Sequence, residues 1–363
     1  MELRIALLLA AVAGAAALYP STEAPGGLTP DQTPQFILFT HDDALRENTY
    51  EAMLEVTEGR QSLNGCPATA TMFTTTRGTD CELVADLYSR GYEISGHTVT
   101  HPSLNGLSKK EIEKEIVGAR SALVKCGIPE ADVVGHRSPY LETKPEVREV
   151  LEEDGFLYDS TLIEEMTGNS LSGGPDSRIF PWNMTIGIPI NCAWYKSIQS
   201  CTEDERHNLW QVPLWPLNGY TMDYGDDGKQ DVFDILKANF DAAYKGNRAP
   251  LPIFIHTPWL ERSNHLDRLK DFADYALSKP DVYFVTVRQL LAWMQKPIPA
   301  EKLTPLTLGC GNAGGAGPVA NKAYSVNDKL APSPAPSVPA PAPGPAEVDA
   351  EVAAPAPARR GSA

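Results

Sequence analysis

Short apolar runs alternate with amphipathic stretches between residues 35 and 294, and this alternation constrains the fold more than any other feature of the 363-residue chain. It is typical of βα units around a parallel sheet. Segment 163–207 breaks the rhythm with Gly, Pro and two cysteines, so we expect a long loop or insertion there. The runs that we interpret as strands are 36–40, 70–73, 92–95, 133–135, 156–158, 210–213, 253–256 and 282–287.

Nearly all of the polar residues suited to chemistry lie at the C-terminal ends of these runs. They are Asp42 and Asp43 after the first run, His97 after the third, Arg137 after the fourth, Asp159 after the fifth and His256 at the seventh. The C-terminal ends of parallel strands converge on one face of a barrel, where active sites lie. The sequence therefore predicts a single barrel-like domain with one catalytic mouth.

The two ends of the chain differ from its middle. Residues 1–17 place Arg4 before an apolar run and a stretch of small residues, which is the pattern of a secretory signal peptide. The apolar run is shorter than the roughly 20 residues that a bilayer requires, so we expect no transmembrane span. Residues 312–363 are rich in Gly, Pro and Ala and predict a disordered tail after a catalytic domain at 28–311.

Cysteine usage and charge narrow the cellular context. The six cysteines include no CxxC pair, which favours disulfides in an oxidising compartment over a zinc ribbon. Cys192 and Cys201 enclose only a short loop and are expected to pair, whereas the sequence leaves the pairing of the other four open. The formal net charge of -16 disfavours a nucleic-acid partner. We expect a secreted protein, extracellular or in the cell wall.

Two histidines four residues apart, His97 and His101, suggest a pair of metal ligands, because one helical turn would place both imidazoles on the same face. In a chain with seven histidines, two of them can also stand four residues apart by chance. Zincin proteases place a Glu base directly after the first His, but this chain has Thr98 there. Asp42 and Asp43 can supply a third ligand and a base, because adjacent residues of a strand point to different sides. A helix cap or an Asx-turn is the alternative for such a pair alone.

Two further residues suit amide hydrolysis. His256 is a candidate general acid, because the departing amine needs a proton; a buried structural histidine is the alternative. Arg137 can hold a buried carboxylate ionised, and the turn that it opens can present backbone amides to an oxyanion. A surface ion pair is the alternative for Arg137.

In their order along the chain these residues resemble the polysaccharide deacetylases of carbohydrate esterase family 4, most closely chitin deacetylases of the insect-like type. The resemblance covers residues 35–296. It implies a single distorted (β/α) barrel with seven or eight parallel strands, which removes acetyl groups from N-acetylglucosamine units of chitin or chito-oligosaccharides. The motifs are Thr40-His41-Asp42-Asp43-Ala44, His97-Thr98-Val99-Thr100-His101-Pro102, Arg137-Ser138-Pro139-Tyr140, Asp159-Ser160-Thr161 and Phe254-Ile255-His256.

The resemblance also implies a role for each residue. The catalytic set is Asp42 as general base, Arg137 as the partner that orients it, the amide of Tyr140 as oxyanion donor, His256 as general acid and Asp159 as the residue that tunes His256. The binding set is Asp43, His97 and His101 for one divalent metal ion, expected to be zinc, Phe254 and Tyr140 for substrate, and Trp182 and Trp215 for sugar stacking or core packing.

One departure from the family concerns His41, where the family usually has Phe. His41 alternates away from Asp42 along the strand, so we expect a packing or supporting role and no fourth metal ligand. We expect a monomer acting on an N-acetylglucosamine polymer or oligomer. Peptidoglycan is the alternative substrate, and a carbohydrate-binding wall protein is the alternative from another functional class.

Overall fold

The computed structural model describes residues 21–164, 174–190, 192–202, 204–217 and 230–316. The predicted signal peptide lies outside these residues, as does the predicted tail from residue 317 onward. The chain divides into two units, Met1–Tyr324 and Ser325–Ala363, and all of the described residues belong to the first. None of the helices in the described ranges is long and apolar enough to cross a membrane.

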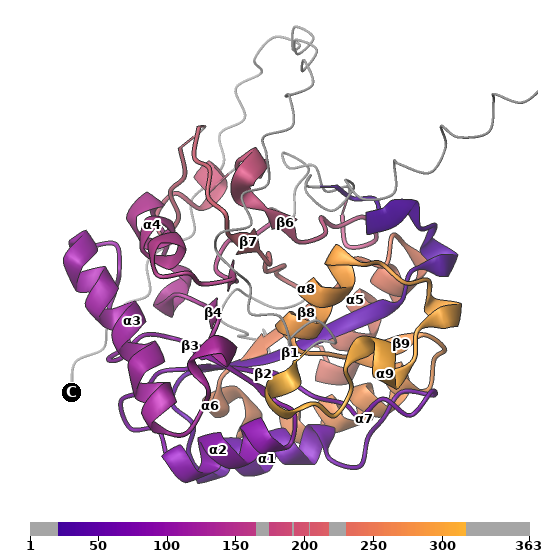
Figure 1. The fold of residues 1–363 in the computed structure, drawn as a ribbon. Coiled ribbons are helices and arrows are strands. Elements are labelled where there is room, and N and C mark those ends of the chain that lie inside the picture. Colours follow the sequence, from indigo (N-terminus) through magenta and orange to yellow (C-terminus); the bar gives the residue numbers. More distant parts are fainter. Residues whose placement is uncertain (1–20, 165–173, 191, 203, 218–229, 317–363) are drawn as a thin grey trace, which may run out of the picture. The chain divides into compact units, whose positions relative to one another are not determined.

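A mostly parallel sheet lies at the centre of this unit and curls into a half-barrel (Figure 1). This confirms the predicted fold class, and each of the eight apolar runs contributes a strand. The insertion adds one more strand, β6, which pairs antiparallel with β7 and was not predicted. The strands are β1 (Gln35–Asp42), β2 (Thr71–Thr74), β3 (Glu93–Gly96), β4 (Gly135–His136), β5 (Tyr158–Asp159), β6 (Trp182–Asn183), β7 (Trp210–Gln211), β8 (Leu251–Ile255) and β9 (Val282–Phe284).

Strand β1 pairs with three other strands, β2, β8 and β9, and all eight of its residues are buried. Such a strand is covered on both faces, which explains its nearly continuous apolar sequence. Ile37 pairs with β8 on one edge and with β9 on the other, while Asp42 pairs with Phe73 of β2 further along. The C-terminal end of β1 therefore lies between the ends of β2 and β8, where polar side chains from three strands meet.

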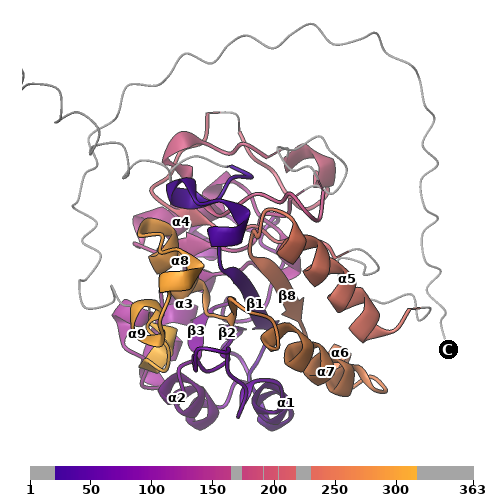
Figure 2. The same ribbon diagram turned by 90° about the vertical axis from the view of Figure 1, so that its right-hand side faces the viewer.

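Helices cover the outside of the sheet (Figures 1 and 2). Helix α3 shows why: its buried residues Ile112, Ile116, Ala119 and Leu123 are spaced by three or four positions and form one apolar face. The α-helices are α1 (Glu47–Thr57), α2 (Cys81–Ser89), α3 (Lys109–Lys125), α4 (Pro145–Glu153), α5 (Val232–Lys245), α6 (Thr257–Leu260), α7 (His265–Leu277), α8 (Val287–Gln295) and α9 (Pro305–Leu308).

Helix α8 closes the N-terminal ends of β2 and β3. Its first N–H groups donate to side chains at the starts of these strands: Val287 to Thr71 Oγ1 at 3.1 Å and Arg288 to Glu93 Oε2 at 2.9 Å. A carboxylate at a helix N-terminus is favourable because the helix dipole is positive there. Tyr158 donates its hydroxyl to the other Glu93 oxygen at 2.7 Å. This end of the sheet is sealed, which leaves the C-terminal ends to carry a site.

Three disulfides join segments of the described part of the chain. The predicted Cys192–Cys201 bridge is confirmed, and the other pairs are Cys66–Cys310 and Cys81–Cys126. The segment after Cys310 still packs against the domain, because Gly315 O accepts a hydrogen bond from Thr286 Oγ1 at 2.7 Å.

Candidate active site

The centre of the candidate site is an ion pair between Asp42, the last residue of β1, and Arg137, which follows β4. Arg137 Nη1 lies 2.7 Å from Asp42 Oδ1, and both side chains are at most 3% exposed. The guanidinium also donates to Thr40 Oγ1 at 2.8 Å, Ser160 O at 2.9 Å and Ser160 Oγ at 3.0 Å. A buried cation needs such partners, since desolvation is costly. Arg137 is therefore fixed in place and in turn fixes the Asp42 carboxylate.

The surroundings of Asp42 favour its charged form. Burial alone would raise the pKa of this carboxyl, but the charge of Arg137, with His97 and His256, outweighs burial and holds the pKa below its usual value. Asp42 is consequently an ionised carboxylate that can accept a proton.

Asp43, His97 and His101 present one ligand atom each, and these atoms all lie within 4.8 Å of one another. Asp43 Oδ1 is 3.2 Å from His101 Nε2 and 3.9 Å from His97 Nε2. Two imidazoles and one carboxylate form the ligand set of an open zinc site, in which three protein groups bind the ion.

The orientation of His97 tests whether these residues fit a metal ion. Its Nδ1 lies 2.7 Å from Arg137 O, which places the ring N–H on Nδ1. Its Nε2 is buried, points to Asp43 and His101, and has no hydrogen-bond partner among the described residues. Metal-binding histidines usually donate their other ring N–H to a carbonyl or carboxylate in this way. The three residues therefore fit a divalent cation.

The expectation of a helical turn between His97 and His101 is wrong. Both follow β3 in a loop, where Thr98 (φ 67°) and His101 (φ 60°) have left-handed backbone conformations, as does Asp43 (φ 95°). These angles are uncommon for residues other than Gly and concentrate at functional sites. They bring the two rings side by side, with centroids 5.0 Å apart.

Glu115 on α3 holds this loop. Its carboxylate accepts hydrogen bonds from Val99 N at 2.9 Å, Thr100 N at 2.8 Å and Thr100 Oγ1 at 2.8 Å. Helix α3 approaches the loop closely at Gly118, where a Cβ would lie 2.9 Å from Val99 Cγ2. The loop between the two imidazoles is thus fixed by a helix that contributes no ligand.

The turn after Arg137 carries Tyr140 at the rim of the site. Tyr140 (φ 57°) and Leu141 (φ 54°) are both left-handed. Leu141 N donates to Ser138 O at 3.1 Å, but among the described residues the Tyr140 N–H donates to no acceptor. The Tyr140 ring is 59% exposed and meets the His101 ring edge-on at 4.6 Å. A free backbone donor therefore lies next to the candidate metal ligands.

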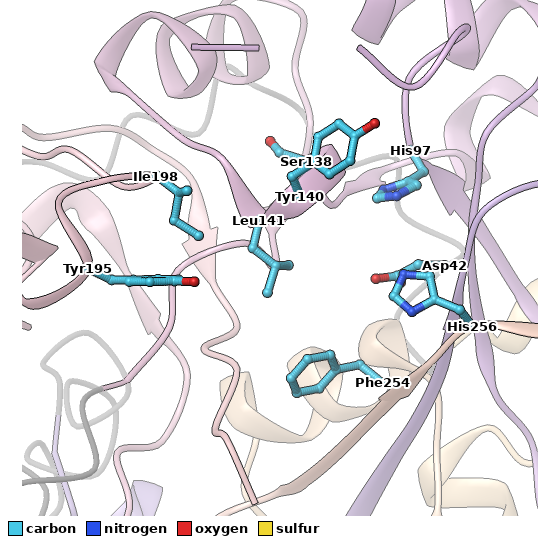
Figure 3. A pocket seen from close by; sticks show the side chains of 9 residues that line it. All are labelled: Asp42, His97, Ser138, Tyr140, Leu141, Tyr195, Ile198, Phe254 and His256. Atoms are coloured by element: carbon cyan, nitrogen blue, oxygen red, sulfur yellow. The ribbon is translucent and has the colours of Figure 1, made fainter. Parts of the chain in front are cut away.

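One pocket is bordered by some of the predicted site residues, whereas Asp43, His101 and Arg137 do not line it (Figure 3). His256 directly follows β8, and its ring lies beside the Asp42 carboxylate, while Phe254 lies two residues earlier on the same side of the strand. Tyr195 and Ile198 lie at the opposite end of the pocket. The complete lining is Asp42, His97, Ser138, Tyr140, Leu141, Tyr195, Ile198, Phe254 and His256.

Sequence analysis missed four of these residues, Ser138, Leu141, Tyr195 and Ile198. The first two lie in or beside a recognised motif. The other two lie inside the Cys192–Cys201 loop, whose closure was predicted but whose return to the pocket was not. Gln199 holds that loop to the site, because its Nε2 donates to Leu141 O at 3.0 Å and Thr161 O at 2.9 Å.

The predicted tuning of His256 by Asp159 stays a prediction, because no hydrogen bond or ion pair joins the two side chains among the described residues. Asp159 is fully buried at the end of β5 and accepts hydrogen bonds from Thr161 Oγ1 and from Gln211 Nε2. Burial raises its pKa. Thr161 Oγ1 in turn accepts from Ser138 N at 3.0 Å. Through Thr161, Asp159 also supports the turn that carries Tyr140.

The expectation of sugar stacking by Trp182 and Trp215 also needs correction. Their exposures are 0% and 2%, and neither lines the pocket. Trp182 Nε1 donates to Gly187 O at 3.2 Å, and the Arg178 guanidinium lies 5.8 Å from the Trp215 ring centroid. Both rings pack in the core, where no sugar can reach them.

A buried ionic cluster attaches the insertion to α4. Arg148 donates to both carboxylate oxygens of Glu205, and His207 Nε2 lies 3.1 Å from Glu205 Oε1. Burial alone would raise the pKa of Glu205, but the hydrogen bonds from His207 and Arg148 lower it to about 2. Arg148 also donates to Ser200 O at 2.7 Å, next to the disulfide. The cluster thus holds the segment that delivers Tyr195 to the pocket.

Glu205→Gln is expected to lower the free energy of unfolding by about 3 kcal/mol at pH 7. A carboxyl group whose pKa falls on folding stabilises the folded state at every pH above the pKa that it has in the unfolded chain. That contribution is lost as the pH falls from about 5 to about 2. The difference in unfolding free energy between the variant and the wild type should therefore shrink over this range and vanish at about pH 2. Urea unfolding at several pH values measures it. Asp204→Asn, at an exposed neighbouring position, is the control. A difference independent of pH would contradict the assignment.

Comparison with known proteins decides the family. Residues 29–158 match the family model described as polysaccharide deacetylase. The chain is 31% identical over 301 residues to chitin deacetylase 1 from Bombyx mori, in an alignment that covers 76% of this chain and 54% of that protein. The chain belongs to the polysaccharide deacetylase family. This confirms the resemblance, and the chain spans about half the length of that relative.

Two further similarities accompany this one. Chitin deacetylase 8 from Bombyx mori is 26% identical to this chain over 300 residues, in an alignment that covers 78% of this chain and 76% of that protein. A solved family 4 carbohydrate esterase from Streptomyces lividans, in complex with acetate, is 16% identical, with 75% of this chain and 98% of that chain covered and a TM-score of 0.42. Within the chain, the family match contains Asp42, Asp43, His97, His101 and Arg137; His256 lies beyond it.

Proposed function

We propose that the chain is a secreted, metal-dependent N-deacetylase that hydrolyses the acetamido group of N-acetylglucosamine units in chitin or chito-oligosaccharides. The products are chitosan and acetate. The observation that carries this proposal is the ionised Asp42, held by Arg137, in a pocket with His256 and beside three converging ligand atoms. The names of the two Bombyx mori relatives support a chitin-type substrate. Three disulfides support an oxidising compartment.

Asp43, His97 and His101 would hold one divalent ion, for which zinc suits the ligand set best. When bound there, such an ion would supply Lewis acidity to the acetamide carbonyl. Asp42 accepts a proton from the attacking water as the new C–O bond forms, and Arg137 keeps that carboxylate ionised and oriented. The Tyr140 N–H donates to the oxygen on which negative charge develops.

His256 completes the proposed reaction by giving a proton to the nitrogen as the C–N bond breaks, so that a neutral amine leaves. His256 and Asp42 lie at the same end of the pocket (Figure 3), which supports their assignment as acid and base. Phe254 and Leu141 offer apolar surface to the acetyl methyl group, and Tyr195 offers a ring at the opposite end of the pocket. We assign these functions to one catalytic domain, residues 28–311, acting as a monomer.

Acetate release tests the proposal. Purified protein should release acetate from chito-oligosaccharides, lose this activity to a chelator and regain it with zinc. Peptidoglycan fragments form the parallel arm, and activity there alone would move the substrate assignment to peptidoglycan. Glycan binding without acetate release from either substrate, with zinc present, would favour a carbohydrate-binding wall protein and refute the enzyme.

Glu115→Ala is expected to weaken zinc affinity about 10- to 100-fold, because the loop between His97 and His101 loses three hydrogen bonds. Competition against a chromophoric chelator measures the affinity without substrate. Glu113→Ala changes an exposed position of the same helix and should bind zinc like the wild type. Equal affinities in the two variants would show that the loop holds its shape without Glu115.

A further inference from the structure

His41 is a buried polar residue for which the proposed chemistry has no use. It lies in β1 between Thr40 and Asp42, and its exposure is 0%. Neighbouring residues of a strand point to opposite faces, so the His41 ring lies on the other side of β1 from the Asp42 carboxylate. A buried imidazole requires hydrogen-bond partners, and the partner that it has lies on a different element.

That partner is Thr257, the residue after His256. His41 Nε2 and Thr257 Oγ1 are 2.9 Å apart. Thr257 Oγ1 is also 2.6 Å from the hydroxyl of Thr49, which is buried in the first turn of α1. The Thr257 side chain is therefore held from two sides by the interior of the domain.

The backbone at His256 needs such support. Strand β8 ends at Ile255, whose pairing with His41 is the last register pair between β1 and β8. His256 is the N-cap residue of α6, which has only four residues, and so short a helix has little stability of its own. Glu261, just after α6, accepts a hydrogen bond from Asn48 Nδ2 at 2.6 Å, but that contact is exposed. Besides the backbone bonds that His256 O accepts from Trp259 N and Leu260 N, the part-buried His41–Thr257 contact ties the residue next to His256 to β1.

We propose that His41 is a positioning residue, which fixes the His256 imidazole through Thr257 so that it meets the leaving amine. This inference rests on the proposed function, because it assumes that His256 is the general acid. It predicts that losing the hydrogen bond impairs proton delivery to the amine and leaves metal binding and water attack intact.

Two variants remove the hydrogen bond from either side. His41→Phe keeps a planar ring in the buried position, and Thr257→Val keeps the shape of a half-buried side chain. Each should lower kcat on a chito-oligosaccharide roughly tenfold, with KM and zinc content unchanged, because a slightly misplaced catalytic group loses rate but not binding. The double variant should be no slower than either single variant. His41→Gln, whose amide can donate or accept in place of Nε2, should recover most of the rate.

Two substrates with different leaving groups distinguish a misplaced His256 from general damage to the active site. An aryl acetate such as para-nitrophenyl acetate expels a phenolate that needs no proton, so its hydrolysis does not depend on a general acid. His41→Phe, Thr257→Val and His256→Ala should all lose much more rate on the acetamide than on the aryl ester. Asp42→Asn should lose rate on both substrates.

Each result decides a separate point. Equal loss on both substrates in His41→Phe and Thr257→Val, or no loss in either, overturns the role of His41. A His256→Ala variant without a selective loss on the acetamide refutes the assignment of the general acid, and the inference with it. A wild-type enzyme that hydrolyses the aryl ester but releases no acetate from N-acetylglucosamine oligomers refutes the proposed function itself.

Discussion

Asp42→Asn is expected to retain its metal ion while its kcat falls roughly 10²- to 10⁴-fold, the usual contribution of a general base. Its neighbour should behave differently. Asp43→Asn should lose the metal ion, because a neutral amide is a poorer donor than the carboxylate that lies between His97 and His101. The geometry gives the reason: Asp42 points to Arg137, and Asp43 points to the imidazoles.

The measurement is metal content by elemental analysis beside acetate release for each variant. His256→Ala serves as a second reference, since it should keep the metal and lose turnover. Activity and metal content are then uncoupled at Asp42 and coupled at Asp43. Metal loss in Asp42→Asn with retention in Asp43→Asn would reverse the assignment of base and ligand, and near-normal turnover in Asp42→Asn would exclude it as the base.

The strand order could not be deduced from the sequence, but the strands themselves could. Strand β1 is buried on both faces, which forces a continuous apolar run, and the same burial sets the other seven runs apart from the amphipathic helices. The convergence of Asp42, His97, Arg137 and His256 follows from parallel pairing, because the C-terminal ends of parallel strands share one edge. Sequence reasoning reaches this far because both effects are local or follow from topology.

Three failures have a common cause, which is that spacing does not report backbone conformation or burial. A separation of four residues fits a helical turn, yet left-handed angles at Thr98 and His101 bring the imidazoles together in a loop. A Trp can stack on a sugar or fill a core, and only the fold buries Trp182 and Trp215. Tyr195 reaches the pocket through a disulfide loop held by distant partners, which no local pattern encodes.

Arg137→Met is expected to lower the free energy of unfolding by about 3–5 kcal/mol at neutral pH, the usual cost of removing one partner from a buried ion pair. The methionine fills part of the space but leaves the Asp42 carboxylate buried without its cation. Arg120→Met is a suitable control. The Arg120 guanidinium lies over the Phe156 ring and donates to Val133 O and Asp154 O, so its removal strands no buried carboxylate. Urea unfolding of both variants measures the difference.

Adding Asp42→Asn to Arg137→Met separates the lost charge pair from lost packing. If an uncompensated carboxylate causes the instability, the double variant should be more stable than Arg137→Met alone, because an amide costs less to bury than a charge. Acid should have the same effect on the single variant: burial without a cation raises the pKa of Asp42, so protonation relieves the cost as the pH falls. The double variant lacks this group and supplies the baseline for the other carboxyls. Additive destabilisation by the two substitutions, with parallel pH profiles, would mean that Arg137 stabilises the domain through Thr40 and Ser160 and not through its charge.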